Sequence, residues 1–410
     1  MKFQSLKFML MSYCILLLAG MSQFLIIVVL EKHLSLSLYS KYTLIFSFFP
    51  IYQMVLDLGL QGEVIKRLQT GINKSAELRR MVRLRLGTSI IAVAFALAHS
   101  FFAGLDTTLI VGVLVLSLCF IPFSFLMNLE IVGYSDRKWY LATSSRFGKL
   151  LGAIVFVIVF LTAKSKEAPA TLIYGFSGML FTYSVLAAVL YWVGRVHFKA
   201  YWDRKLGIPA LFTSSYGIIV NFGFWWLFGS LFSVLNIRLF GADGLAVFNT
   251  AFVLMTPVSL GVQLGLNFSL TIKDDLEKKI PLLWGLSIIF TIFYGLILNI
   301  DSFFGIFFKN IDHTMVMHCL WPLILAHPIL AISQRQAIIL QSASYKNPVA
   351  FAPLVAVFTV GVAVIYSVIY TMPYYGMSYV FLIASLSYFI FIYSKWLKYT
   401  RYLPLPHIQD

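Results

Sequence analysis

Apolar stretches of about 20 residues recur along the whole chain, and no other feature constrains its fold as strongly. A helix rises about 1.5 Å per residue, so each stretch is long enough to cross the hydrocarbon core of a bilayer. Of the 410 residues, 60% are hydrophobic and 11% are charged, whereas soluble domains carry about 25% charged residues. The sequence therefore predicts an all-α polytopic membrane protein.

Twelve of these stretches are present, and we interpret each as a transmembrane helix. The first follows Lys2 and Lys7 and has no small-residue cleavage site. It is longer than the apolar region of a signal peptide, about 7–15 residues, so we interpret it as a span. The predicted spans are residues 8–30, 40–64, 84–104, 107–129, 147–163, 170–193, 209–237, 245–270, 281–300, 315–336, 349–371 and 375–394.

The basic residues are distributed unevenly between the two sides of the membrane. With the N-terminus in the cytoplasm, 25 of the 31 Lys and Arg residues fall on the cytoplasmic side and 6 outside. This is the bias of the positive-inside rule, so we expect both termini in the cytoplasm. The net charge of +15 then reflects topology and contact with anionic membrane lipids, and no nucleic-acid partner is expected.

The sequence shows no pattern typical of a metal site or of a catalytic site. The three cysteines lie in apolar runs and are interpreted as small buried hydrophobic residues. No metal-ligand spacing and no Ser/His/Asp set is visible. We therefore expect no metal, no cofactor and no enzymatic activity. A polytopic polysaccharide polymerase or glycosyltransferase is the less favoured alternative, because such enzymes generally need a sizeable outside loop.

Two pairs of segments indicate an internal repeat. Residues 51–68 align with residues 257–274 at an offset of 206, which places Leu58-Gly59-Leu60 on Leu264-Gly265-Leu266. Residues 129–136 align with residues 340–347 at an offset of 211, and an insertion of five residues between 300 and 314 would reconcile the two offsets. Both pairs lie six spans apart, so the halves have the same orientation. We expect two parallel six-helix lobes, residues 1–200 and 201–410, around a central cleft.

These segments resemble the polysaccharide-export branch of the multidrug/oligosaccharidyl-lipid/polysaccharide exporter superfamily. The likeness is carried by LYSKYTLIFSFFPIYQMVLDLGL (38–60), its repeat GLAVFNTAFVLMTPVSLGVQLGL (244–266), and the pair LEIVGYSDRKWYLA and LQSASYKNPVAFAP. In that family a glycine commonly precedes the Tyr or Phe of the second helix, whereas here Lys41 precedes Tyr42 and Val247 precedes Phe248.

The resemblance implies a flippase of the bacterial inner membrane. Its substrate would be a polyprenyl-pyrophosphate-linked oligosaccharide, such as an O-antigen unit, moved by alternating access. Polysaccharide polymerase and glycosyltransferases would be further partners. An ion-coupled drug antiporter of the same superfamily is the main alternative, although drug exporters usually place an acid in the first helix. Here the first acid is Glu31, at the outer end of that span.

A flippase needs polar and cationic side chains that face its substrate. In the seventh span, polar and small residues recur at steps of three or four, so they share one helical face. That face either contacts sugars, with Trp225 stacking on a ring, or packs against another helix. The outer-end cations either receive pyrophosphate or extend to the membrane interface. The candidate substrate-binding residues are Arg238, Lys41, Lys32, Asn221, Trp225, Ser233, Gln23, Gln263, Asn267, Arg146 and Lys149.

Titratable residues within or near the spans are candidates for coupling transport to a proton or another ion. Asp57, Glu130 and His327 are the residues we select, and Glu63 and His99 also belong to this class. The alternative for Asp57 and Glu63 is an ion pair with Lys66 or Arg67, about one helical turn away.

Overall fold

The computed structural model describes most of the first half of the chain and separate segments of the second half. The described residues are 14–15, 18–19, 22, 24–57, 74–102, 104–136, 139–163, 169–193, 220, 235–236, 238–241, 243–255, 289, 291–309, 311–342, 346–369 and 373–402. Within these residues the regular structure is entirely helical. The helices are α2 (Leu36–Asp57), α4 (Lys74–Phe102), α5 (Thr107–Leu118), α6 (Phe120–Asp136), α7 (Trp139–Ala142), α8 (Ser144–Thr162), α9 (Pro169–Val193), α14 (Asp301–Phe307), α15 (His313–Ser342), α16 (Lys346–Ile369) and α17 (Gly376–Tyr402).

The helices are long and apolar enough to confirm a multi-pass membrane protein. In the described residues, six helices meet the length and composition of a membrane span, and α5 and α6 together form one of them, Thr107–Gly133. Two shorter apolar helices, Asp243–Leu254 and Phe351–Tyr366, accompany them. The predicted total of twelve spans stays a prediction, because several spans lie wholly or partly outside the described residues.

The chain forms two compact units. The N-terminal unit comprises Met1–Ser215 together with the short segment Phe307–Asn310. The C-terminal unit comprises Tyr216–Ile306 and Ile311–Asp410. Because the two units are not placed relative to one another, each is described by itself.

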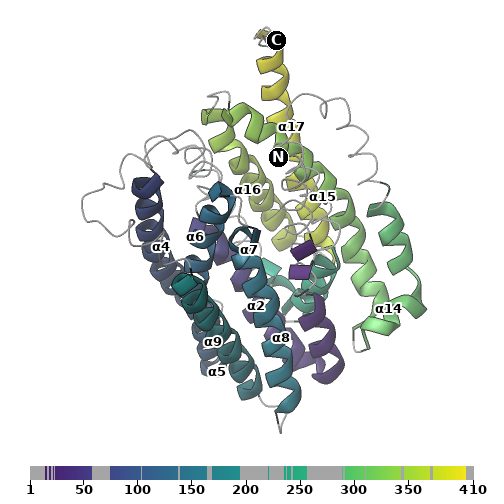
Figure 1. The fold of residues 1–410 in the computed structure, drawn as a ribbon. Helices are drawn as coiled ribbons and strands as arrows, with labels where there is room; N and C mark the ends of the chain where they lie inside the picture. Colours follow the sequence, from purple (N-terminus) through teal and green to yellow (C-terminus); the bar gives the residue numbers. More distant parts are fainter. Residues whose placement is uncertain are drawn as a thin grey trace. The chain divides into compact units, whose positions relative to one another are not determined.

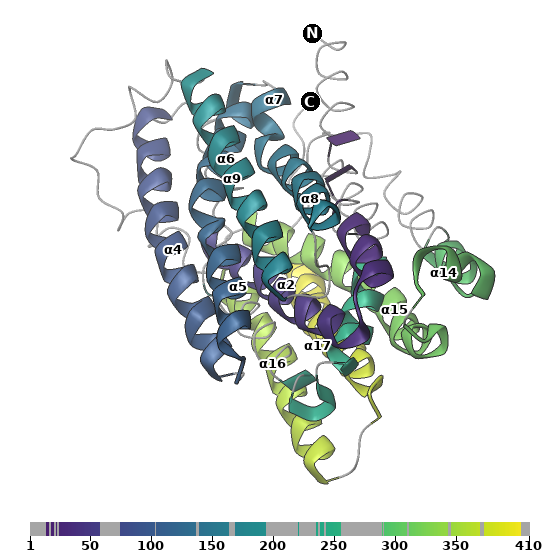
Figure 2. The same cartoon turned by 90° about the horizontal axis from the view of Figure 1, so that it is seen from below.

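In the N-terminal unit, α9 packs against α5, α6 and α8, and α2 packs against α4 and α5 (Figures 1 and 2). Glycines allow α8 and α9 to approach closely. A Cβ atom added at Gly152 would lie 2.7 Å from Cε1 of Tyr183, and one added at Gly175 would lie 2.6 Å from Cε2 of Phe156. Small residues at helix contacts are the usual means of close packing in membranes, where apolar side chains gain little from leaving lipid.

In the C-terminal unit, α17 packs against both α15 and α16 (Figure 2). The long helix α15 contains Pro322 and Pro328 in its interior. Proline removes one backbone hydrogen bond of the helix, and membrane helices tolerate this where neighbouring helices supply other partners.

The start of one helix in each unit agrees with an internal repeat. α5 begins at Thr107 and α15 at His313, which is an offset of 206, the offset of the first predicted pair of segments. The packing partners also correspond, since α9 contacts α5, α6 and α8 as α17 contacts α15 and α16. The predicted insertion between residues 300 and 314 stays a prediction.

The predicted pairing at an offset of 211 also stays a prediction. Residues 129–136 lie in the last part of α6, while residues 343–345 of the paired segment lie outside the described residues.

The predicted orientation can be tested directly. A parallel repeat and the distribution of basic residues both favour a cytoplasmic C-terminus. We expect a reporter that is active only in the periplasm to stay silent when it is fused after Asp410. Strong periplasmic activity of that fusion would contradict both the span count and the parallel repeat. A fusion in the predicted outside loop at residues 164–168 is the matched positive control.

Candidate functional site

Charged and amide side chains from three helices meet inside the N-terminal unit. Glu130 comes from α6, Arg146 and Lys149 from α8, and Gln53 from α2. Arg146 and Lys149 are three residues apart, so they lie on one face of α8. We call Glu130, Arg146, Lys149 and Gln53, together with Ser145, the charged cluster.

Glu130 is the only acid in the charged cluster, and two residues of α8 hold it. Its side chain is only 5% exposed, and Oε1 lies 3.5 Å from Nε of Arg146. The Ser145 hydroxyl donates a hydrogen bond to the other carboxylate oxygen, Oε2. The neighbouring Ser144 hydroxyl donates to the carbonyl oxygens of Leu126 and Leu141, each at 2.7 Å. These bonds place the start of α8 against α6, so that α8 faces Glu130.

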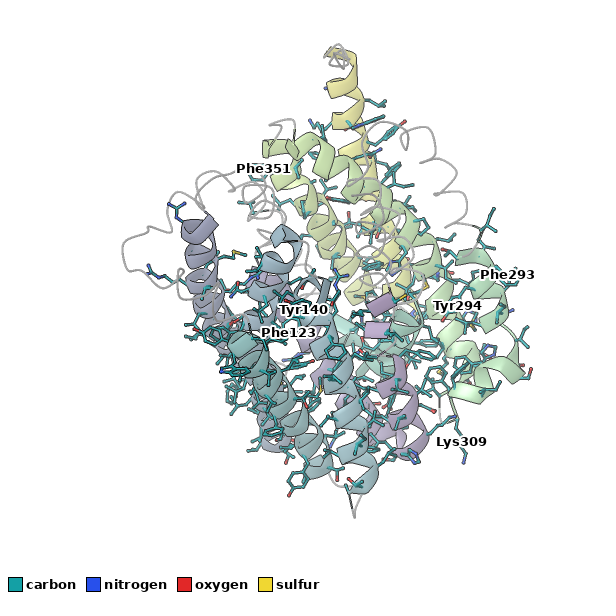
Figure 3. All side chains as sticks on the ribbon, viewed as in Figure 1. Phe123, Tyr140, Phe293, Tyr294, Lys309 and Phe351 are labelled. Carbon is teal, nitrogen blue, oxygen red and sulfur yellow. The ribbon has the colours of Figure 1, made fainter. Side chains whose placement is uncertain are left out.

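The two direct contacts of Lys149 are with neutral groups. Its Nζ donates a hydrogen bond of 2.8 Å to Oε1 of Gln53, and it lies 5.4 Å from the ring centroid of Phe123, which Figure 3 labels. An amide oxygen and an aromatic face attract a cation without cancelling its charge. With two cations and one acid, the charged cluster carries a net charge of +1.

The charges of α8 have no counterpart in α16. At an offset of 206, α16 corresponds to α8, and Ala352 and Val355 stand where the N-terminal unit has Arg146 and Lys149. From Asn347 to Ile369, α16 has no charged residue. A charge inside a membrane costs about 2.5–3.5 kcal/mol on insertion scales.

A second polar contact lies on the opposite side of α6. Arg85 of α4 is fully buried, and its Nη1 donates to Oδ1 of Asn128 at 3.1 Å. Asn128 and Glu130 are two residues apart, so they point to different sides of the helix. The Thr88 hydroxyl donates to the carbonyl oxygen of Leu56 at 3.1 Å, which ties α4 to the end of α2.

The sequence analysis missed Arg85, Asn128 and Ser145. Its only signal for Arg85 was a position near the start of an apolar span, which is also typical of topology-setting residues.

The predicted outer-end cations are more exposed than the charged cluster. Lys41 pairs with Asp106 at 3.7 Å, and their side chains are 38% and 52% exposed. Ion pairs this exposed contribute little to stability. Lys32 and Arg238 are both exposed. Of the predicted cations in the N-terminal unit, the structure therefore brings Arg146 and Lys149 together in the charged cluster. Lys41 lies outside this cluster and pairs with Asp106.

The predicted ion-coupling residues lie on three different helices. Glu130 belongs to the charged cluster, and Asp57 is the last residue of α2. His327 lies on α15 in the C-terminal unit, with its ring 5.9 Å from the ring of Phe252. His99 is buried, and its Nδ1 lies 3.0 Å from the Tyr52 hydroxyl.

Several candidates of the sequence analysis lie outside the described residues. The seventh-span face, the amides outside that span and Glu63 belong here, so these assignments stay predictions. They are Gln23, Asn221, Trp225, Ser233, Gln263, Asn267 and Glu63.

Solved structures reveal what this arrangement of helices resembles. A multidrug resistance MATE family transporter of the MOP superfamily, in an inward-facing conformation, matches with a TM-score of 0.63 and 12% identity, over 94% of this chain and 96% of that chain. The lipid II flippase MurJ in an inward closed conformation matches with a TM-score of 0.64 and 12% identity, over 95% and 87%. A MOP superfamily transporter from Pyrococcus furiosus matches with a TM-score of 0.56 and 12% identity, over 96% and 94%. No protein-family model and no curated protein matches the sequence.

This chain has the MOP transporter fold. The likeness extends over nearly the whole length of all three structures, so the all-helical membrane fold expected from the sequence is confirmed. Multidrug transporters and a lipid-linked flippase both have this fold, so the fold does not choose between the two substrate classes.

A second buried acid in the N-terminal unit, Glu31, was not among the predicted site residues. Glu31 is 1% exposed, and within the N-terminal unit its two carboxylate oxygens accept the Lys309 backbone N–H, each at 2.8 Å. Phe24 packs beside this contact, with its ring centroid 5.3 Å from that of Phe307. The Glu31 carboxylate therefore has a structural partner in the backbone of Lys309.

Proposed function

We propose that the protein is a flippase that moves a polyprenyl-pyrophosphate-linked oligosaccharide across the bacterial inner membrane by alternating access. The observation that carries the proposal is the charged cluster, in which two basic residues, Arg146 and Lys149, stand with a single acid, and Lys149 contacts the neutral Gln53 and Phe123. The cluster lies in a fold shared with MOP transporters.

The sign of the charge favours an anionic substrate. A polyprenyl-pyrophosphate linkage carries about two negative charges. At an effective dielectric near 20, two unit charges about 4 Å apart interact by about 4 kcal/mol before desolvation. Lys149 would attract the pyrophosphate, whereas a cationic drug would be repelled by the same amount.

Two similar structures support an argument from charge. One is named a lipid II flippase, so by its name its substrate is a lipid. For another, the reverse polarity of its binding pocket is reported to suggest a different function. Within this fold, the polarity of the pocket is therefore a reasonable guide to substrate class.

The remaining site residues are part of the proposal. Arg146 and Lys149 would hold the pyrophosphate when the site is open to the cytoplasm, and Lys32, Lys41 and Arg238 would meet it at the outer end. Coupling to an ion would involve Asp57, Glu130 or His327. Polysaccharide polymerase and glycosyltransferases would be the partners. Sugars would contact Asn221, Trp225, Ser233, Gln23, Gln263 and Asn267.

An ion-coupled drug antiporter is the second candidate. The similarity to multidrug transporters favours it, as does the presence of a buried acid, Glu130. However, Arg146 lies 3.5 Å from that acid, so the negative charge a cationic drug would need is already compensated.

Reconstitution into liposomes distinguishes the two candidates. We expect the purified full-length chain to carry a fluorescent polyprenyl-pyrophosphate oligosaccharide from one leaflet to the other, measured by its accessibility to a membrane-impermeant quencher. We expect no proton-driven uptake of a cationic dye by the same vesicles. Dye transport without movement of the lipid-linked sugar would overturn the proposal. Protein-free liposomes and liposomes carrying a monophosphate-linked lipid are the matched controls.

A further inference from the structure

We infer that Glu130 is the release residue of this site, because it competes with the substrate's pyrophosphate for the guanidinium of Arg146. The inference rests on the proposed function, since it assumes an anionic substrate at the charged cluster. In the empty site Arg146 faces Glu130. In the loaded site Arg146 faces phosphate oxygens, and the return of Arg146 to Glu130 favours the departure of the substrate.

The geometry allows Arg146 to exchange partners. Its Nε lies 3.5 Å from the Glu130 carboxylate, which is longer than the about 2.7–2.9 Å of a tight charge-assisted hydrogen bond. The contact is made through Nε, and the guanidinium has four further N–H groups on its two terminal nitrogens. The Arg146 side chain is 25% exposed, so it can reach a ligand without breaking the core.

Glu130 is held in place while Arg146 moves. Its side chain is 5% exposed, and the Ser145 hydroxyl donates to Oε2 independently of Arg146. The carboxylate therefore keeps a hydrogen bond when the guanidinium leaves it. A buried acid that stays fixed beside a more exposed cation is suited to draw that cation back.

Lys149, unlike Arg146, has no acidic side chain among its direct contacts. Its contacts are the Gln53 amide oxygen and the Phe123 ring, and neither is negatively charged. Lys149 can therefore attract the anion in either state, whereas Arg146 adds to the attraction only after it leaves Glu130. On the other side of α6, Arg85 contacts Asn128, so it does not replace Arg146 as the partner of Glu130.

A purely structural role for Glu130 predicts the opposite sign. If Glu130 only joined α6 to α8, its loss would disturb α8 and weaken binding and transport together. If Glu130 competes for Arg146, its loss frees that cation, so binding becomes tighter while turnover becomes slower. The direction of the change in affinity therefore separates the two roles.

The test uses the full chain in lipid nanodiscs, with inorganic pyrophosphate as the probe and calorimetry as the readout. We expect Glu130→Gln to bind pyrophosphate about tenfold more tightly, since the neutral amide no longer holds Arg146. In the liposome assay we expect the same variant to show a lower KM and a several-fold lower maximal rate. Glu130→Asp, which restores the charge, should move both values back toward those of the wild type.

Two further variants keep the outcomes distinct. Glu31→Gln removes the same charge at the outer end of the unit and should not tighten pyrophosphate binding. Lys149→Gln should weaken it.

If Glu130→Gln binds equally or more weakly, while its melting temperature is unchanged and Lys149→Gln still loses affinity, the inference is overturned and the proposed function stands. If the wild type does not bind pyrophosphate at all, both fall. If Glu130→Gln does not fold, Ser145→Ala, which releases Oε2 of Glu130, must change the affinity for pyrophosphate, and an unchanged affinity overturns the inference.

Discussion

Gly133→Ala is expected to abolish accumulation of the folded protein. A Cβ atom at this position would lie 2.0 Å from the backbone nitrogen of Ala142 and 2.4 Å from the carbonyl carbon of Leu141. Both atoms belong to the backbone of α7, so no change of rotamer can relieve the clash. Overpacking of a core usually costs about 1–3 kcal/mol, and a clash with backbone lies at or above the upper end of that range.

The displacement of α7 by this clash would also change the geometry of the charged cluster. Gly133 lies three residues after Glu130, and Ala142 lies three residues before Ser145. The close approach of α6 and α7 therefore brings the start of α8 back beside Glu130. Separating α7 from α6 would move Arg146 away from its acid, so any protein that did fold should have lost its function.

Accumulation can be measured with a fluorescent fusion followed by size-exclusion chromatography in detergent. Gly361→Ala is the matched control, because a Cβ added there meets no atom within 4 Å. Replacing a glycine inside a helix by alanine gains about 1 kcal/mol where there is space, so this control should accumulate as well as the wild type. A sharp peak of normal height for Gly133→Ala would show that α6 and α7 are not in close contact.

The fold could be predicted from the sequence because the length of an apolar run is a local property. The bounds of α9 and the start of α17 follow from apolar runs at residues 170–193 and 375–394, whereas α17 continues to Tyr402, beyond the apolar run. The register of the repeat is not local. The two predicted offsets, 206 and 211, each depended on a few residues, and the starts of α5 and α15 agree with the first of them.

The site was less predictable because the partner of a charge comes from a distant segment. Lys41 and Lys149 look alike in sequence, since each stands near the start of a predicted span. In the structure Lys41 meets Asp106, while Lys149 meets Gln53, which lies 96 residues earlier. An acidic partner compensates a cation and an amide does not, so only the folded chain distinguishes them.

Lys149→Gln is expected to reduce transport of the lipid-linked sugar by at least about tenfold, since a loss of 1.4 kcal/mol is a factor of ten. Glutamine is close to lysine in length and can still donate to Gln53, so the helix contacts of α8 should persist. What is lost is the positive charge that faces the anion. The initial rate of flipping in liposomes measures this loss, at matched protein content and with the melting temperature as a check on folding.

Lys395→Gln is the matched control for this variant. Lys395 lies 5.3 Å from the ring centroid of Phe391, much as Lys149 lies 5.4 Å from that of Phe123, but it stands near the end of α17 and outside the charged cluster. Its replacement removes the same charge from a similar aromatic contact and should leave the rate unchanged.

Lys149→Arg then separates charge from shape. If a point charge suffices, arginine should restore most of the rate. If the short contact with Gln53 positions the charge, the longer and planar guanidinium should restore only part of it. Full transport by Lys149→Gln, with Arg146→Gln also fully active, would mean that the charged cluster does not hold the anion. The outer-end cations Arg238, Lys41 and Lys32 would then be the next residues to test.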